Sequence, residues 1–150
     1  MTTALHDEDI AAWAEEQIRA LARLAERHPE IAAEIDVRHL REELDELRKS
    51  LGRELTSRLA VVLAHFAKWR WQPGQRSRSW PNTIAEQRDQ IMLLLEESPS
   101  LRAALDRHVL RAWPLARRKA ARETGLAPDI FPAERPFAAS DALAPDWLPD

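Results

Sequence analysis

Apolar residues recur at helical spacing along most of the chain, and proline, glycine and polar residues separate the periodic stretches. Asp7 or Asp9 can start the first helix, which ends before Pro29. Gln17 stands in the middle of the apolar face of this helix, where we expect its amide to bond to a neighbouring helix rather than to contact a ligand. A second helix begins after Asp36 and carries leucines at positions 40, 44, 47 and 51.

The stretch 55–71 is apolar on two opposite sides, which is typical of a helix at the centre of its domain. Gly52 precedes this stretch and can break or kink the helix, although the apolar spacing nearly continues through it. We expect both tryptophans of the stretch to fill the interior. One stripe holds Leu55, Leu59, Val62, Phe66 and Trp69, and the opposite side holds Ala60, Ala64, Ala67 and Trp71.

The rest of the chain predicts two more helices and an arm. Ser79 and Pro81 begin a helix that runs to about Glu97, and the sequence SPSL at 98–101 supplies the capped start of a long one. This long helix ends in a left-handed cap at Gly125 and should be kinked by Pro114. From residue 127 the chain is rich in proline but still apolar, so we expect it to pack on the bundle with at most one short helix near 138–143.

The composition leads to the same fold class. Three glycines, no tyrosine and abundant alanine, leucine, arginine and glutamate favour helix over strand. We predict an all-α protein that forms one compact bundle of about five helices. Residues 1–150 would form a single domain, with a helical core over 7–126 and the C-terminal arm over 127–150. Because cysteine is absent, disulfides and thiolate metal sites are impossible.

Hydropathy and charge bear on the cellular compartment and on the kinds of partner that we expect. The longest apolar run, residues 59–64, is too short to span a membrane, so we expect the cytoplasm and no membrane partner. The net charge of −3 divides into −5 for residues 1–64, +7 for 65–122 and −5 for 123–150. A basic middle between acidic ends permits head-to-tail association of two copies.

The segment HFAKWRWQPGQRSRSW, residues 65–80, interleaves tryptophans with basic residues. Such a segment could stack on nucleobases and hold phosphates. It also fits the end of one helix, a loop and the start of the next, with Lys68 and Arg70 in the last turn. In this structural interpretation only Arg76, Ser77 and Arg78 have no evident duty.

The long helix places four arginines within about 60° of one another on a helical wheel, along a stripe about 22 Å long. They lie opposite the expected core positions 109, 113, 116 and 120. The stripe could bind an acidic protein partner, follow a phosphate backbone, or be a solvated face that the acidic ends partly neutralise. The four residues are Arg107, Arg111, Arg118 and Arg122.

Metal and catalytic chemistry find weaker support. His39 and Glu42 are three positions apart on one predicted helix, and His65 could approach from the next, but di-metal bundles use two Glu-x-x-His elements. We therefore expect no metal and no other cofactor. His65 fits a hydrogen-bonded core histidine better than a general base, although a carboxylate from the helix after Asp36 could complete a catalytic pair.

An ordered set of short motifs along nearly the whole chain resembles the bacterial family known as domain of unknown function 29. The resemblance implies an all-helical fold and supplies no reaction, ligand or partner. Arg135 stands where a cysteine is common and Phe137 where a tyrosine is common. The motifs are Trp13 with Gln17, Glu42-Glu43-Leu44, Ser57 with Leu59, His65 with Lys68-Trp69, Gln72-Pro73, Arg76 with Ser79-Trp80, Thr83-Ile84, Arg88, Pro99-Ser100-Leu101, Glu123-Thr124-Gly125-Leu126 and Phe131-Pro132.

Together these patterns predict a cytoplasmic, non-enzymatic interaction or regulatory protein. It would present Arg76, Arg78 and the four arginines of the long helix to an acidic protein partner or to a second copy of itself. The alternative is nucleic-acid binding through the same arginines, with Trp80 stacking on bases if its ring is exposed. A third hypothesis is an enzyme that uses His65.

Overall fold

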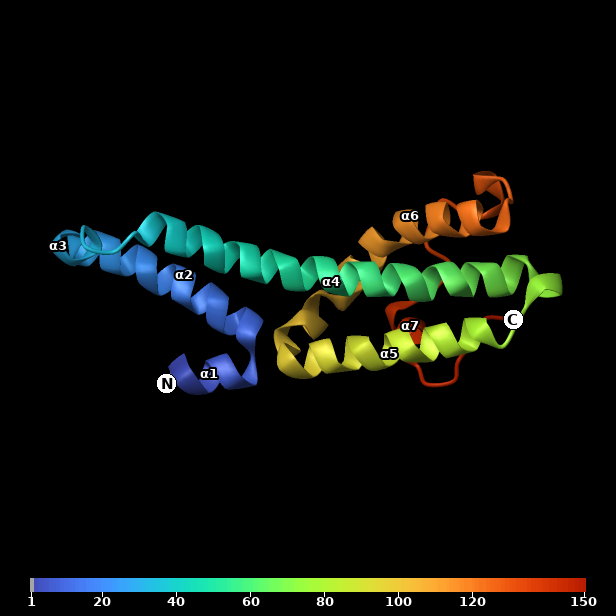
Figure 1. The fold of residues 1–150 in the computed structure, drawn as a ribbon, viewed down its shortest axis with the longest axis horizontal. Coiled ribbons are helices and arrows are strands. Elements are labelled where there is room, and N and C mark those ends of the chain that lie inside the picture. The colour runs from blue at the N-terminus through green and yellow to red at the C-terminus, as the bar shows by residue number, and fades with distance from the viewer. Residues whose placement is uncertain (1) are drawn as a thin grey trace. The chain divides into compact units, whose positions relative to one another are not determined.

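The computed structural model describes residues 2–150, and the surroundings of side chains from residue 4 onward. This part of the chain is 80% helical and contains no strand, so the predicted all-α bundle is confirmed. None of its helices has an apolar stretch long enough to cross a membrane. The α-helices are α1 (Thr2–Glu8), α2 (Ile10–Arg27), α3 (Pro29–Ala32), α4 (Val37–Trp71), α5 (Ser79–Glu97), α6 (Leu105–Thr124) and α7 (Ala139–Leu143) (Figure 1).

Contacts divide the chain into two compact units. Unit 1 comprises residues 1–53 and 94–102, and unit 2 comprises residues 54–93 and 103–150. Helix α4 contributes to both units because it continues through Gly52, in line with the apolar spacing that nearly continues through this glycine. The single domain over 1–150 stays a prediction, and its first residue, Met1, lies outside the described residues.

Asp9 links two segments of unit 1 that are far apart in the sequence. Its carboxylate accepts a hydrogen bond of 2.9 Å from the backbone amide of Ala12, so it caps α2 as the sequence predicts. The same carboxylate also accepts bonds from the amide and the hydroxyl of Ser100, at 2.7 and 2.9 Å. One side chain therefore caps a helix and joins it to a segment 91 positions away in the sequence.

Two polar groups of unit 1 lack the partners that the sequence suggests. The amide nitrogen of Gln17 is buried and has no hydrogen-bond partner among the described residues, so the expected bond to a neighbouring helix is wrong. The hydroxyl of Ser98 is likewise buried and unpaired instead of capping a long helix. A 3₁₀ helix, Pro99–Ala104, follows Ser98, and α6 begins only at Leu105.

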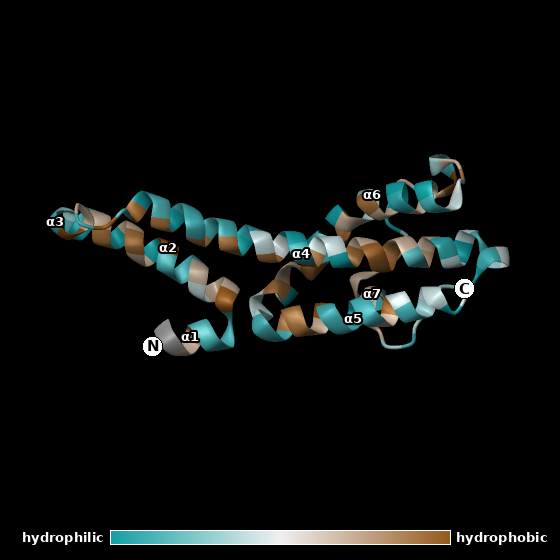
Figure 2. Cartoon of the chain, viewed as in Figure 1, coloured by the Kyte–Doolittle hydropathy of each residue, from teal (hydrophilic) through white to brown (hydrophobic). Residues whose placement is uncertain are grey.

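The second half of α4 forms the centre of unit 2. Leu55, Leu59, Val62 and Phe66 on one side and Ala64 on the other have no exposed surface, which confirms a helix buried on two sides. The apolar residues of α4 gather in this half, whereas its first half is mostly hydrophilic (Figure 2). The expectation for the two tryptophans was too strong, because Trp69 and Trp71 are only half-buried.

The C-terminal arm completes the core of unit 2. Phe131 and Phe137 are buried, and α7 lies where one short helix was predicted. Phe137 packs edge to face against four aromatic rings at centroid distances of 5.2 to 6.5 Å, an arrangement that adds to area burial. These rings belong to Phe66, Trp71, Trp113 and Trp147.

Side chains of α5 and α6 bind the backbone of the arm. Arg88, which is 8% exposed, donates from Nε to the carbonyl of Ala142 and from Nη2 to the carbonyls of Asp141 and Trp147, at 2.9 to 3.0 Å. Trp113 donates to the carbonyl of Pro132 at 3.0 Å. Because the arm has little regular structure, these bonds replace the ladder that would otherwise satisfy its carbonyls.

We predict that Arg88→Met lowers the free energy of unfolding by about 3 kcal/mol, because it leaves buried carbonyls of the arm without donors. Urea denaturation followed by circular dichroism measures this change. Arg78→Met, at an exposed position just before α5, is the matched control and should leave stability nearly unchanged. Equal losses in both variants would contradict the role assigned to Arg88.

Candidate functional site

The aromatic and basic segment 65–80 is largely paired within itself. Three of its basic residues lie over tryptophan rings of the same segment, 4.4 to 5.0 Å from the ring centroids. Each ring therefore already has a cation on its face, where a nucleobase would have to stack. The pairs are Lys68 over Trp80, Arg70 over Trp71 and Arg76 over Trp69.

Arg76 has an internal duty that the sequence did not reveal. Its Nε donates to the carbonyl of Trp69 at 2.8 Å, which satisfies a free carbonyl in the last turn of α4. Its guanidinium also stacks on the indole of Trp69. Arg78, by contrast, is exposed, and its side chain makes no ion pair or hydrogen bond within the described part of the chain. Binding of a partner by either arginine stays a prediction.

An ion pair between a buried lysine and an exposed glutamate joins α4 to the end of α6. The ammonium of Lys68, a residue 7% exposed, lies 2.9 Å from Oε2 of Glu123, and Lys119 lies 3.1 Å from Oε1. Lys68 lies in the last turn of α4, as the sequence predicts, and its partner on α6 is an addition from the fold. Burial raises the pKa of the Glu123 carboxyl, but hydrogen bonds from the two lysines outweigh burial and hold this pKa below its ordinary value.

His65 lies in the same neighbourhood and is 8% exposed. Its Nδ1 donates to the carbonyl of Val61 at 2.8 Å, and burial lowers the pKa of its imidazole. The charged groups that act on it are Lys68, Glu123 and Lys119. The carboxylate that acts on His65 therefore belongs to α6, whereas the suggested pair of His65 with a carboxylate from the helix after Asp36 stays a prediction.

The residues considered as candidate metal ligands, His39, Glu42 and His65, do not come together. His39 bonds to Asp36 at the start of α4, and Glu42 lies 3.4 Å from Arg38. His65 belongs to the same continuous helix, 26 positions further along, and not to a second helix facing His39. Within residues 4–150 no three His, Asp or Glu side chains form a group that could hold a metal ion.

The four predicted arginines of α6 are all exposed, while the core positions opposite them, Val109, Trp113, Ala116 and Ala120, are buried. Helix α6 continues through Pro114, so the stripe lies on a single helix. Among residues 4–150 none of the four forms an ion pair or a hydrogen bond. Neighbouring cations on α6 are paired: Arg117 lies 3.8 Å from Asp129, and Lys119 contacts Glu123.

Two leucines accompany these arginines. Leu110 and Leu115 are 53% and 42% exposed and lie at the edges of the stripe on a helical wheel. We call the set Arg107, Leu110, Arg111, Leu115, Arg118 and Arg122 the arginine face. Helical spacing alone divides α6 into a core side and a charged side, so it does not reveal these two exposed leucines.

The arginine face acts on the interior of unit 2. His108 is 6% exposed and its Nδ1 lies 2.9 Å from the hydroxyl of Thr56. Burial lowers the pKa of His108, and the positive charges of Arg107 and Arg111 lower it further. This inward effect is expected of cations that no neighbouring carboxylate neutralises.

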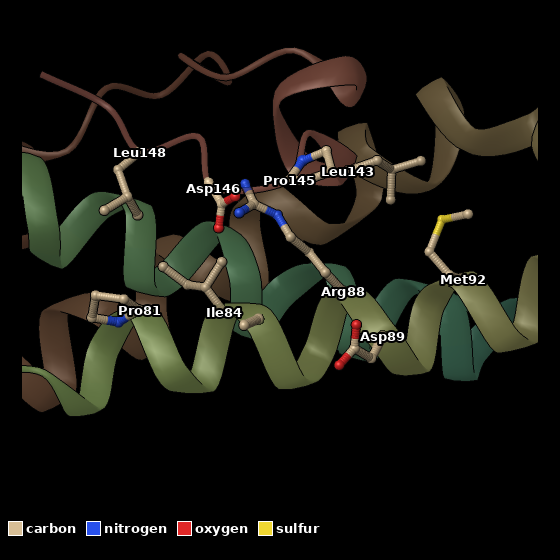
Figure 3. A pocket seen from close by; sticks show the side chains of 10 residues that line it. Pro81, Ile84, Arg88, Asp89, Met92, Leu143, Pro145, Asp146 and Leu148 are labelled. Carbon is tan, nitrogen blue, oxygen red and sulfur yellow. The ribbon is translucent and has the colours of Figure 1, made fainter.

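A pocket of about 390 Å³ opens between α5 and the arm in unit 2 (Figure 3). Its lining is mainly apolar, and Asp89 and Asp146 stand beside it. The guanidinium of Arg88 lies at its base, where burial lowers the arginine pKa and the charge of Asp146 opposes this. Local sequence patterns do not reveal this pocket, because its two walls are more than 50 positions apart in the chain. Its apolar lining includes Ile84, Met92, Leu143 and Leu148.

The family model described as domain of unknown function DUF29 matches residues 5–148, so the chain belongs to this family, as its motifs indicated. No curated protein and no solved structure matches the chain.

We predict that the pH dependence of stability reveals the Glu123 ion pairs. The folded carboxyl has a lowered pKa, so its contribution is complete above the ordinary value of 4.5 and is lost as the pH falls through the folded value. The wild type should exceed Glu123→Gln in stability at neutral pH, and the difference should shrink below pH 4.5. Urea denaturation across this range measures it, and a constant difference would contradict the pairing.

We also predict that Arg107→Gln with Arg111→Gln raises the pKa of His108, because two positive charges that oppose its protonation are removed. Proton–carbon NMR titration of the histidine ring measures the shift. Arg23→Gln with Arg41→Gln, at exposed positions of unit 1, removes the same charge elsewhere and serves as the control. An identical titration in all three proteins would contradict the prediction.

Proposed function

We propose that this DUF29 protein is a non-enzymatic, cytoplasmic interaction or regulatory protein whose arginine face binds an acidic protein partner. The pairing of charges along α6 supports the proposal most directly. Arg117 and Lys119 have carboxylate partners within the chain, whereas four arginines on the outer side have none among the described residues. Such arginines keep all their donors for carboxylates on another molecule, including bidentate pairs.

The exposed leucines favour a protein over a nucleic acid. Leu110 and Leu115 add apolar area beside the charged groups, and protein interfaces combine apolar with polar contacts. A phosphate backbone offers nothing comparable for leucine side chains to contact. The partner that fits best is an acidic helix with its own apolar positions, laid along α6.

The second candidate function, nucleic-acid binding, rests on the same arginines alone. The rings that could have stacked on bases already have cations over them, and Trp80 is only half-exposed. Contacts to phosphates would then supply nearly all the affinity and would make binding strongly dependent on salt.

We predict that Arg111→Glu with Arg118→Glu abolishes partner binding while the fold persists, because both positions are exposed. The tagged wild type and variant are expressed in the native host, captured after nuclease treatment, and compared by quantitative mass spectrometry. The expected result is at least one acidic protein that the wild type enriches about tenfold or more over the variant. Far-ultraviolet circular dichroism checks the fold.

Arg23→Glu with Arg41→Glu is the matched control, since it makes the same charge change at exposed positions of unit 1. This control should keep the partners of the wild type. Loss of the same partners in both variants would show that net charge, and not the arginine face, selects them. Enrichment that disappears with nuclease, together with a mobility shift of nucleic acid at low salt, would favour the second candidate function.

A further inference from the structure

Unit 2 carries a surface whose properties are the reverse of the arginine face. The pocket between α5 and the arm has apolar walls, which include Ile84, Met92 and Leu143, and two carboxylates beside them (Figure 3). Asp89 and Asp146 are both exposed and form no ion pair among residues 4–150. We call this pocket, with its two aspartates, the acidic groove.

Arg88 offsets part of the charge of the two aspartates that line the acidic groove, but one guanidinium does not cancel two carboxylates. Three of its five N–H groups already donate to the carbonyls of Ala142, Asp141 and Trp147, and the residue is buried. The guanidinium of Arg88 forms no ion pair with Asp146 among the described residues, although the two charges act on each other at longer range. The groove therefore presents two exposed carboxylates and one buried guanidinium among apolar side chains, which leaves it with a negative net charge.

We infer that the acidic groove of one molecule receives the arginine face of a second copy, so that the protein associates head to tail. Leu110 and Leu115 would lie on the apolar floor, and Arg111 and Arg118 would pair with the two aspartates of the groove. This inference rests on the proposed function, because it uses the same face and names a partner for it.

The dimensions of the two surfaces agree. The α5 wall of the groove runs from Pro81 to Met92, about 16 Å at 1.5 Å per residue. Arg111 and Arg118 are about 10 Å apart along α6 by the same measure. Two turns of α6 therefore fit along the wall.

Charge complementarity points to a second copy as the partner. The arginine face has four exposed arginines without a carboxylate partner among the described residues, and the groove has two exposed aspartates without an ion-pair partner there. Each surface has an apolar part, and the unpaired charges of one surface are opposite in sign to those of the other. Because the two surfaces differ, the contact is heterologous, and each molecule keeps one free surface of each kind after pairing.

The experiment measures the mass of the purified full-length protein in solution by sedimentation velocity, up to several hundred micromolar, in about 50 mM and about 500 mM NaCl. The face variant is Arg111→Glu with Arg118→Glu. The groove variant is Asp89→Lys with Asp146→Asn. Asparagine is chosen at 146 because this residue has φ of 60°, a left-handed conformation that asparagine tolerates.

The wild type should self-associate at low salt and dissociate at high salt, and each variant alone should associate at least about tenfold more weakly. Mixing the two variants is the decisive step. The face variant keeps an intact groove and the groove variant keeps an intact face, so the mixture should form a 1:1 complex and stop there. The control, Arg23→Glu with Arg41→Glu, should associate as the wild type does.

A wild type that stays monomeric at every concentration and both salt levels overturns the inference, as does an association that neither variant weakens. Association of the wild type without complex formation in the mixture also overturns it, because the contact must then lie elsewhere. The same experiments distinguish failure of this inference from failure of the proposed function. If the wild type is monomeric but still captures an acidic protein through the arginine face, the proposed function holds and only the second-copy partner is lost.

Discussion

The contact between Arg88 and the C-terminal arm is the interaction on which unit 2 depends. A guanidinium taken out of water carries a large desolvation cost, and three carbonyl oxygens of the arm offset that cost here. The arm is needed for the core as well, because Phe131 and Phe137 fill the space beside α4 and α6. Helices and arm are therefore interdependent: without the arm the arginine would be buried unpaired, and without the arginine the arm carbonyls would lack donors.

Because a buried charge needs a partner within the chain, the cations of unit 2 fall into two groups. Cations that are buried or partly buried have partners within the chain, as Lys68 has in Glu123 and Arg117 has in the carbonyl of Phe131. Cations that remain in water, such as Arg111 and Arg118, need no internal partner and have none among the described residues. The basic middle of the sequence is thus partly structural and partly free for recognition, and only the free part supports a proposal about function.

The tryptophans show how folding removes an apparent functional signal. In sequence, the segment 65–80 has the composition of a surface that binds nucleic acids. In the fold, each of three tryptophans carries a lysine or arginine from the same segment. Arg76 closes the end of α4 through the carbonyl of Trp69. Exposed arginines without a partner in the described chain lie on α6, beside two exposed leucines. This combination supports the proposal of a protein partner over a nucleic acid.

The sequence by itself determined the helices, because local spacing, caps and breakers decide them: Asp9 caps α2, Asp36 precedes α4 and Gly125 ends α6 with a φ of 74°. It also determined the side of α6 that is exposed, since helical period alone separates arginines from core residues. Only the tertiary structure decided the partners of Lys68 and Arg88, the acidic groove and the unpaired state of Gln17. Those features depend on contacts between segments more than 50 positions apart, or on the absence of such contacts, and local spacing carries no information about either.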